Sequence, residues 1–161
     1  MNEENSAFRL TPEQEEIRAL AARVAAERYR PKAYEWDQQR VHLPGSERQF
    51  LASLGLLAMT LPEEYGGGGR PLIEALLVLE ELAKATPIAA WPVFEASTGP
   101  ARVLHLFGTE RQKRKYLPDV AAGRSTIAVA ISEPNAGSAA TDVATHARIE
   151  GNEVVINGTK R

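Results

Sequence analysis

The stretch that decides the fold is Ala128–Ser138, AVAISEPNAGS, in which an apolar run gives way to a polar turn with proline and glycine. Pro134 lacks a backbone donor and therefore ends a strand. Gly137 has no side chain, so the main chain can approach a ligand closely there. The hydroxyls of Ser132 and Ser138 add to the free backbone N–H groups, and such a turn can hold a phosphate or the polar edge of a ring. The stretch predicts a strand that ends in a ligand-binding turn.

Taken alone, this turn indicates no more than a connection, because glycine and proline mark turns in most proteins. Further motifs extend the pattern along the chain. They are LPEEYGG at Leu61–Gly67, FGTERQ at Phe107–Gln112, YLP at Tyr116–Pro118, and INGTK at Ile156–Lys160. Their order and spacing give the turn a context that a chance connection lacks.

Together these motifs resemble the acyl-CoA dehydrogenase family from Leu10 onward. The resemblance implies a mainly α fold, with an N-terminal helical bundle followed by the first strands of a small antiparallel β domain. We expect an all-helical domain at residues 1–124 and an incomplete middle β domain, carrying the flavin-binding turn, at residues 125–161. The family's remaining strands and its C-terminal helical domain have no counterpart here. The chain is therefore expected to be the N-terminal part of a longer enzyme.

The resemblance also implies FAD as the cofactor. The family's cofactor-binding positions, carried over residue by residue, are Val129, Ala130, Ile131, Ser132, Gly137 and Ser138. The first four would lie along the flavin ring, with the Ser132 hydroxyl in place of the usual threonine at the pyrimidine end. Ser138 would sit between the FAD pyrophosphate and the acyl-CoA chain, and so would also bind substrate. Glu133 is expected to be structural, because its place in the family is not that of the catalytic carboxylate.

By the same resemblance, the complete protein would oxidise an acyl thioester to the 2-enoyl thioester, with hydride transfer to the flavin. Its substrate would be acyl-CoA or a related acyl thioester, and its full-length form would be a homo-oligomer. No catalytic residue is expected within this chain, since the family's base lies in the C-terminal domain. The isolated chain should therefore be inactive.

Two departures from the family pattern leave other functions open. Ala139 stands where the family usually has Asp, and Ala144 stands where an Arg is common. A flavoprotein acting on another acyl carrier, or a flavin monooxygenase or oxidase, would fit these changes. A different class of function is a catalytically silent helical module that packs against another chain through apolar helix faces and an open β edge.

Composition excludes several classes of protein. The 161 residues carry 19 basic and 21 acidic side chains, a formal charge of −2, which implies neither nucleic-acid binding nor attraction to a membrane surface. Cysteine is absent, so disulfides and thiol catalysis are excluded. The histidines, His42, His105 and His146, lack metal-ligand spacing, and no metal is expected. No apolar run spans a membrane and the polar start Met1–Asn5 is no signal peptide, which favours the cytoplasm.

Helix signals dominate the first 124 residues. Thr11–Gln14 forms a capping box and opens a helix to about Arg30, where Pro31 predicts an interruption or a kink. Ser46–Gln49 repeats the capping pattern, and Gly55 is expected to mark the end of that helix.

A second group of helices is predicted after the glycine run Gly66–Gly69, which is interpreted as a flexible loop because the lysine of a P-loop is missing. Pro71 opens one helix, and a stretch near 88–106 should break or kink at Pro92 and Pro100. Thr109 caps a final helix whose basic residues are typical of a solvated face, with a CoA phosphate contact as the alternative. They are Arg111, Lys113, Arg114 and Lys115.

After Gly123 the pattern becomes that of strands. Strands are predicted at Ser125–Ile131, Thr141–Ile149 and Glu153–Ile156, with a tight hairpin between the last two. Asn157–Gly158 is the signal for a further type I′ turn. With three strands, the predicted sheet would keep an unpaired edge.

Overall fold

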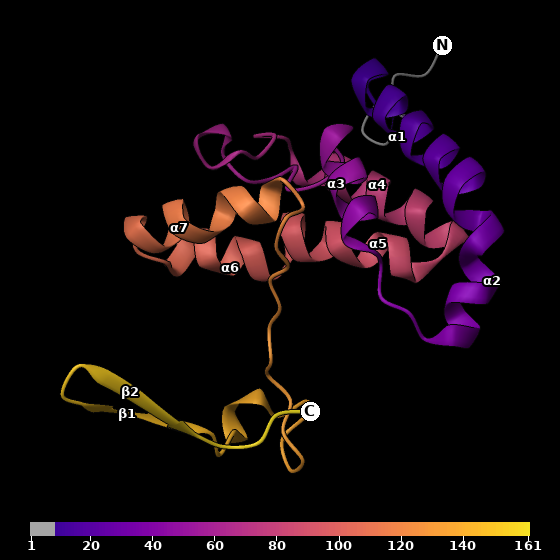
Figure 1. Ribbon diagram of the computed structural model, residues 1–161. Helices are drawn as coiled ribbons and strands as arrows, with labels where there is room; N and C mark the ends of the chain where they lie inside the picture. Colours follow the sequence, from indigo (N-terminus) through magenta and orange to yellow (C-terminus); the bar gives the residue numbers. More distant parts are fainter. Residues whose placement is uncertain (1–8) are drawn as a thin grey trace. The chain divides into compact units, whose positions relative to one another are not determined.

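The computed structural model describes residues 9–161, which form two compact units, residues 9–127 and 128–161 (Figure 1). The first is helical and the second contains a two-stranded antiparallel sheet, so the predicted fold class is confirmed. The domain boundary expected at residue 125 stays a prediction for the complete protein. The interpretation of Met1–Asn5 falls outside the described residues.

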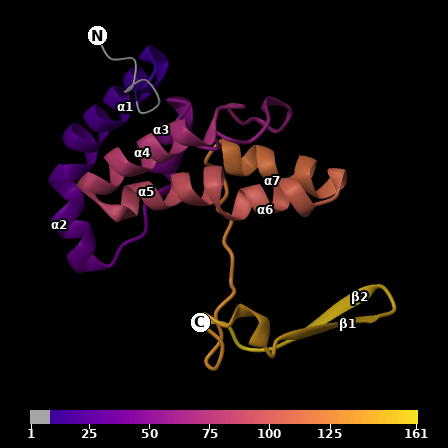
Figure 2. The same ribbon diagram turned by 180° about the vertical axis from the view of Figure 1, so that it is seen from behind.

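Within residues 9–127, the first unit is built from seven α-helices, and the longest connection, residues 54–71, lies between the third and the fourth. Their bounds are α1 (Pro12–Val24), α2 (Arg30–Gln39), α3 (Gly45–Ser53), α4 (Leu72–Ala85), α5 (Pro87–Val93), α6 (Pro100–Phe107) and α7 (Glu110–Ala121). Helix α4 packs against α1 and α5, and α6 lies beside α7 (Figure 2). The core between them holds large side chains that are fully buried, namely Tyr29, Leu51, Leu56, Met59, Leu61, Leu82 and Leu117.

The predicted kink at Pro31 takes the form of a π-helical turn, η2 (Ala25–Tyr29), that joins α1 to α2. The Arg30 N–H donates to the carbonyl of Ala25, five residues back. Proline lacks the N–H of a regular helix and collides with the carbonyl four residues earlier. The wider turn next to Pro31 lets the helix continue, so this is a kinked continuation and not a break. The capping box of Thr11 with Gln14 is confirmed.

The start of α3 differs from the prediction. The helix begins at Gly45 after Pro44, and no side chain caps it, so Ser46 lies inside the helix and is not its cap. The reason is the burial of Glu47, whose carboxylate accepts a 2.6 Å hydrogen bond from the Arg28 guanidinium. This ion pair fixes the rotation of the first turn more strongly than a serine cap at the surface could. The end of the helix before Gly55, which has φ 71°, is as predicted.

The glycine run is held by hydrogen bonds and does not behave as a free linker. It lies against the buried irregular segment 56–61: the N–H groups of Gly68, Gly69 and Arg70 donate to the carbonyls of Ala58, Leu61 and Met59. A Cβ on Gly67 would come within 2.2 Å of the Leu61 carbonyl oxygen. The close approach satisfies backbone carbonyls that would otherwise be buried without a partner.

The remaining helix signals are largely confirmed. Helix α4 follows Pro71, and Thr109 caps α7 in a capping box with Gln112. The stretch near 88–106 does break at Pro100, after the π-helical turn η4 (Phe94–Thr98). Pro92, in contrast, is accommodated inside α5.

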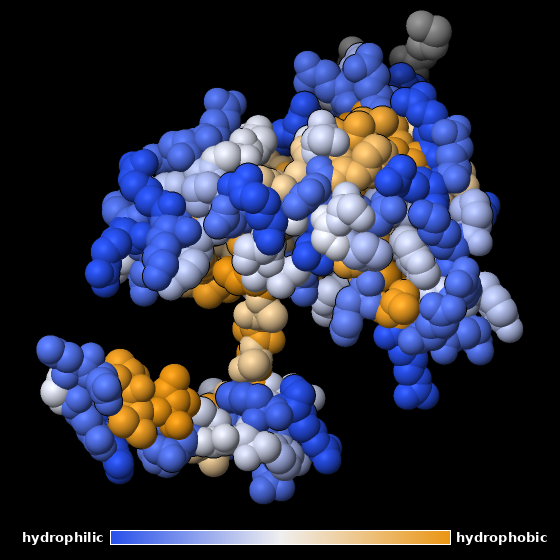
Figure 3. All heavy atoms as spheres, viewed as in Figure 1, coloured by the Kyte–Doolittle hydropathy of each residue, from blue (hydrophilic) through white to orange (hydrophobic). Residues whose placement is uncertain are grey.

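The second unit contains one β-hairpin, β1 (His146–Glu150) and β2 (Glu153–Asn157). Its register pairs Ala147 with Ile156 and Ile149 with Val154, so these four side chains share one face, which is apolar and exposed (Figure 3). The hairpin turn at residues 151–152 is therefore as predicted.

Three of the β predictions are wrong. Residues 125–131 are extended without being a strand, because no other part of residues 9–161 forms a ladder with them. Residues 141–145 begin with a 3₁₀ turn, η5 (Ala140–Asp142), so the strand starts only at His146. Asn157 is not in the left-handed region that a type I′ turn requires, and Gly158 instead packs against Thr145. The apolar pattern of residues 125–131 does not by itself predict a strand, because a strand also needs a hydrogen-bonded partner.

The end of α7 provides a test of this packing. Gly123 is buried with φ 70°, and a Cβ there would lie 2.7 Å from backbone atoms of Arg48. Gly55 has the same backbone conformation, φ 71°, with no atom within 4 Å of its Cβ position. The left-handed conformation costs an alanine roughly 1–2 kcal/mol. Gly55→Ala should lower the free energy of unfolding by that amount, and Gly123→Ala by clearly more. Urea denaturation followed by circular dichroism measures both, and equal losses would contradict the close contact.

Candidate functional site

The centre of the second unit is the carboxylate of Glu133. Its Oε2 accepts a 2.7 Å hydrogen bond from the Ala144 N–H, and its Oε1 accepts from the Thr145 N–H at 3.0 Å and from the Lys160 ammonium at 2.9 Å. The residue is buried. One side chain thus joins three stretches of chain that are distant in sequence, and the expectation that Glu133 is structural agrees with these contacts.

The same contacts govern the charge of this group. Hydrogen bonds from Thr145, from Lys160 and from the Ala144 backbone stabilise the ionised form and hold the pKa of Glu133 at about 2, against the ordinary 4.5. A carboxylate whose pKa is this low is a weak proton acceptor, and its oxygens are already occupied by donors. It is therefore unsuited to act as a general base.

The turn after Glu133 is closed by a pair of backbone hydrogen bonds. The Glu133 N–H donates to the Ala136 carbonyl at 2.8 Å, and the Ala136 N–H donates back at 3.2 Å. Pro134 lies at the first central position of the turn, where its fixed φ is favourable. Gly137 follows, and a Cβ there would meet no atom within 4 Å. Its φ is not left-handed either, so neither packing nor backbone conformation within the described chain requires glycine at this position.

The segment before the turn is open to solvent. Val129, Ala130, Ile131 and Ser132 are all exposed, as is Ser138 beyond the turn. Within residues 9–161 the N–H groups of residues 128–132 donate to no other group. Apolar side chains next to unpaired backbone donors make a surface that can pack against a flat ring and hydrogen-bond its polar edge.

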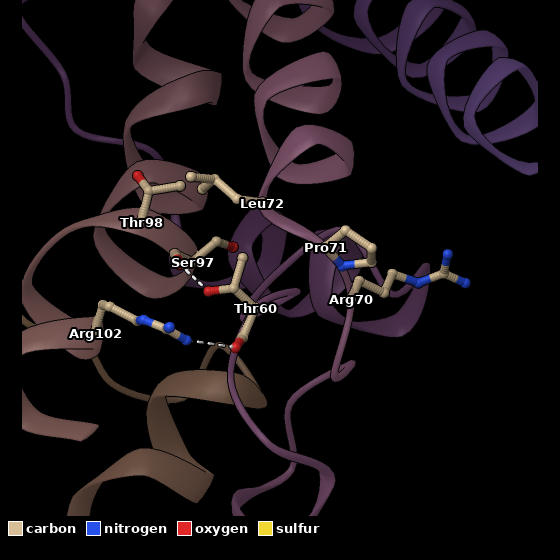
Figure 4. A pocket seen from close by; sticks show the side chains of 7 residues that line it. All are labelled: Thr60, Arg70, Pro71, Leu72, Ser97, Thr98 and Arg102. Carbon is tan, nitrogen blue, oxygen red and sulfur yellow. Dashed lines mark hydrogen bonds between the residues drawn. The ribbon is translucent and has the colours of Figure 1, made fainter. Parts of the chain in front are cut away.

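The helical unit contains a pocket of about 320 Å³, lined by Thr60, Arg70, Pro71, Leu72, Ser97, Thr98 and Arg102 (Figure 4). Its polar groups serve the fold. The buried Ser97 Oγ accepts from the Met59 N–H at 3.1 Å, the Thr60 hydroxyl donates to the Ser97 carbonyl, and Arg102 donates to the Thr60 carbonyl at 3.2 Å. Arg70 points away and pairs with Glu74 at 2.7 Å. We assign no ligand to this pocket.

Charged side chains on α7 are likewise paired within the helical unit. On α7, Lys113 pairs with Glu110 and Arg114 pairs with Glu64, as expected for a solvated charged face. No group of three or more His, Asp or Glu side chains in residues 9–161 is placed to hold a metal ion. In the same part of the chain, no helix is both long and apolar enough to cross a membrane. We take the open segment 128–138, with its backbone donors that are unpaired within residues 9–161, as the candidate site.

Comparison with known proteins adds independent evidence. The family model described as the acyl-CoA dehydrogenase N-terminal domain matches residues 11–124. The chain belongs to the acyl-CoA dehydrogenase family. It is 41% identical over 152 residues to acyl-CoA dehydrogenase FadE12 of Mycobacterium tuberculosis, a match that covers 92% of this chain and 38% of the relative. The resemblance deduced from the motifs is thereby confirmed.

Two further relatives show the breadth of the acyl-CoA dehydrogenase family. A 3-sulfinopropanoyl-CoA desulfinase of Variovorax paradoxus is 35% identical over 153 residues, covering 95% of this chain and 38% of that protein. The structure of a glutaryl-CoA dehydrogenase from Mycobacterium smegmatis in complex with FADH2 superimposes with a TM-score of 0.88 at 26% identity, over 97% of this chain and 40% of that one. The chain thus spans about two fifths of the length of these relatives.

The structure brings some of the predicted site residues together and leaves others apart. Val129 to Ser132 form one continuous exposed segment, and Gly137 and Ser138 follow on the far side of the closed turn. Their contact with a cofactor stays a prediction. Sequence reasoning missed Lys160, although it lies in the quoted INGTK motif. Ala144 and Thr145 were also missed as partners of Glu133, because they contribute backbone N–H groups, which any residue other than proline supplies.

The low pKa of Glu133 makes the second unit sensitive to acid. The group has a depressed pKa in the folded chain, so the unfolded chain binds more protons between pH 4.5 and about 2. The stabilisation is complete above pH 4.5 and is lost as the pH falls through about 2. NMR titration of the Ala144 and Thr145 amide signals should show a midpoint near pH 2. The Glu133→Gln chain should lack that transition, and a wild-type midpoint near 4.5 would contradict the assignment.

Proposed function

We propose that this chain is the N-terminal part of an FAD-dependent enzyme that oxidises an acyl thioester to the 2-enoyl thioester, and that residues 128–138 form part of its flavin site. The observation that carries the proposal is the open segment itself. Apolar side chains and unpaired N–H groups run side by side along residues 128–132. Beyond the closed turn follows Gly137, a glycine that the chain's own packing does not require. The structure of the related glutaryl-CoA dehydrogenase with FADH2 supports the choice of cofactor.

In this proposal the chain's residues bind and orient. Val129 and Ile131 offer exposed apolar surface to the flat face of the ring. The Ser132 hydroxyl and N–H offer donors to its polar edge, and Gly137 and Ser138 leave room and a hydroxyl for the phosphate and acyl parts of the ligands. FAD would supply the two-electron acceptor for the oxidation. The base that removes the α-proton is assigned to no residue of this chain, since the Glu133 carboxylate is already occupied by its three donors.

The alternatives are less well supported. A silent helical module would have no use for unpaired donors beside an open glycine turn. The desulfinase among the relatives indicates that other reactions of CoA thioesters occur in the family. Ala144 replaces the family's common Arg without disturbing Glu133, because the contact uses the Ala144 backbone N–H.

The reaction can be tested with the complete protein encoded by the gene that contains this sequence. Addition of acyl-CoA without an electron acceptor should abolish the visible absorbance of the bound flavin, because reduction is then trapped. The 161-residue chain, supplied with FAD, should show no such loss, since it lacks the base. Rapid loss of flavin absorbance with the 161-residue chain would contradict the proposal that the base lies outside it. A native gene product of 17.6 kDa would instead favour the interaction module.

The cofactor site can be tested at Gly137. Gly137→Val fills space that is empty in the structure and should leave the melting temperature unchanged, while it blocks approach of a ligand to the backbone. We expect FAD binding by the complete protein, measured by fluorescence quenching, to weaken by about tenfold or more, equal to about 1.4 kcal/mol. The matched control is Ala147→Val, an exposed position on β1. Unchanged FAD affinity in Gly137→Val would contradict the proposed site.

A further inference from the structure

Lys160 connects two features of the second unit. Its ammonium group donates to the Glu133 carboxylate at 2.9 Å and to the backbone carbonyl of Ile131 at 3.1 Å. The next residue, Arg161, donates its N–H to the Ser132 carbonyl at 2.9 Å. The end of the INGTK motif is thus bonded to successive carbonyls of the segment assigned to the flavin.

The carboxylate that anchors this lysine is itself held by hydrogen bonds. Glu133 is buried, and two backbone N–H groups hold its carboxylate independently of Lys160. The Lys160 side chain is itself 31% exposed, so it is partly shielded from competing water. A lysine ammonium has three donors, and two of them are directed here at fixed acceptors. The ammonium group is therefore held between two acceptors, the Glu133 carboxylate and the Ile131 carbonyl.

Fixing the Ile131 carbonyl has a consequence for the next N–H. The peptide bonds of the described chain are all trans. In a trans peptide the C=O of one residue and the N–H of the next point in opposite directions in one plane. Lys160 on the Ile131 carbonyl therefore directs the Ser132 N–H away from the lysine. Within residues 9–161 that N–H has no acceptor.

We propose that Lys160, anchored by Glu133, is a positioning residue that orients the Ser132 N–H toward a hydrogen-bond acceptor of the bound cofactor. The inference rests on the proposed flavin role of residues 128–138. It assigns to Lys160 no contact with the cofactor. The lysine acts through the Ile131–Ser132 peptide, and it presets before binding an orientation that the ligand would otherwise have to impose.

The simpler alternative is that Lys160 only neutralises the buried charge of Glu133. Two variants separate these roles. Lys160→Met removes both the charge and the donor to Ile131, and leaves Glu133 ionised without its lysine. Glu133→Gln combined with Lys160→Met also removes the uncompensated charge, and still lacks the donor to Ile131. If neutralisation were the only role, the double variant would recover the wild-type order of the Ser132 amide and the wild-type FAD affinity.

The first measurement needs no cofactor. NMR relaxation of the 161-residue chain should give the Ser132 amide an order parameter near 0.85 in the wild type and below about 0.6 in both variants. The Ala144 and Thr145 amides of Lys160→Met should stay ordered, because they still bind the Glu133 carboxylate. Lys115→Met, which removes an exposed lysine on α7, is the control. An unchanged order parameter of Ser132, or its recovery in the double variant, would overturn the inference.

The second measurement is FAD affinity of the complete protein. Lys160→Met and the double variant should both bind FAD about tenfold more weakly or worse than the wild type. Wild-type affinity in the double variant would show charge neutralisation and overturn the positioning role. A wild type that binds no FAD would refute the proposed function and with it the flavin role of Lys160. The relaxation data would then decide separately whether the lysine orients Ser132.

Discussion

The buried carboxylate of Glu133 is the interaction on which the second unit depends. Within that unit, residues 128–161, only Glu133 and Ala136 are buried, so there is almost no apolar core. Order must come from polar contacts instead, and hydrogen bonds to an ionised group are stronger than those between neutral groups. The carboxylate ties the turn to the backbone before β1 and to the lysine after β2. Lys160 and Arg161, which follow the hairpin, add hydrogen bonds to the carbonyls of Ile131 and Ser132.

The helical unit is stabilised in a different way. Its helices bury a continuous set of apolar side chains, and the irregular segment 56–61 runs through this core. A buried segment without helical hydrogen bonds needs other partners for its backbone. The glycine loop and the Ser97 hydroxyl provide them. The glycines that look like a linker in sequence are therefore part of the core's hydrogen bonding.

The two units also differ in what they offer to function. In the helical unit, the polar groups of the described pocket are used within the fold, and the ion pairs of α7 are of the ordinary surface kind. In the second unit, the backbone N–H groups of residues 128–132 make no hydrogen bond within residues 9–161, and the apolar side chains of Val129 and Ile131 are exposed. Unpaired backbone donors beside exposed apolar side chains can hydrogen-bond the polar edge of a ring while the side chains pack on its face. Membership of the acyl-CoA dehydrogenase family makes a flavin the natural ligand to propose.

The sequence by itself determined the family, the helical character of the first unit and the hairpin of the second. Capping boxes at Thr11 and Thr109 and the 3.6-residue apolar period act within a few residues, so they can be recognised without a structure. Tertiary structure decided the start of α3, because the buried pair of Glu47 with Arg28 overrides a local serine cap. It also decided that residues 125–131 form no ladder, since pairing depends on a partner strand. The Glu133–Lys160 contact joins residues 27 positions apart, and no local pattern specifies such a pair.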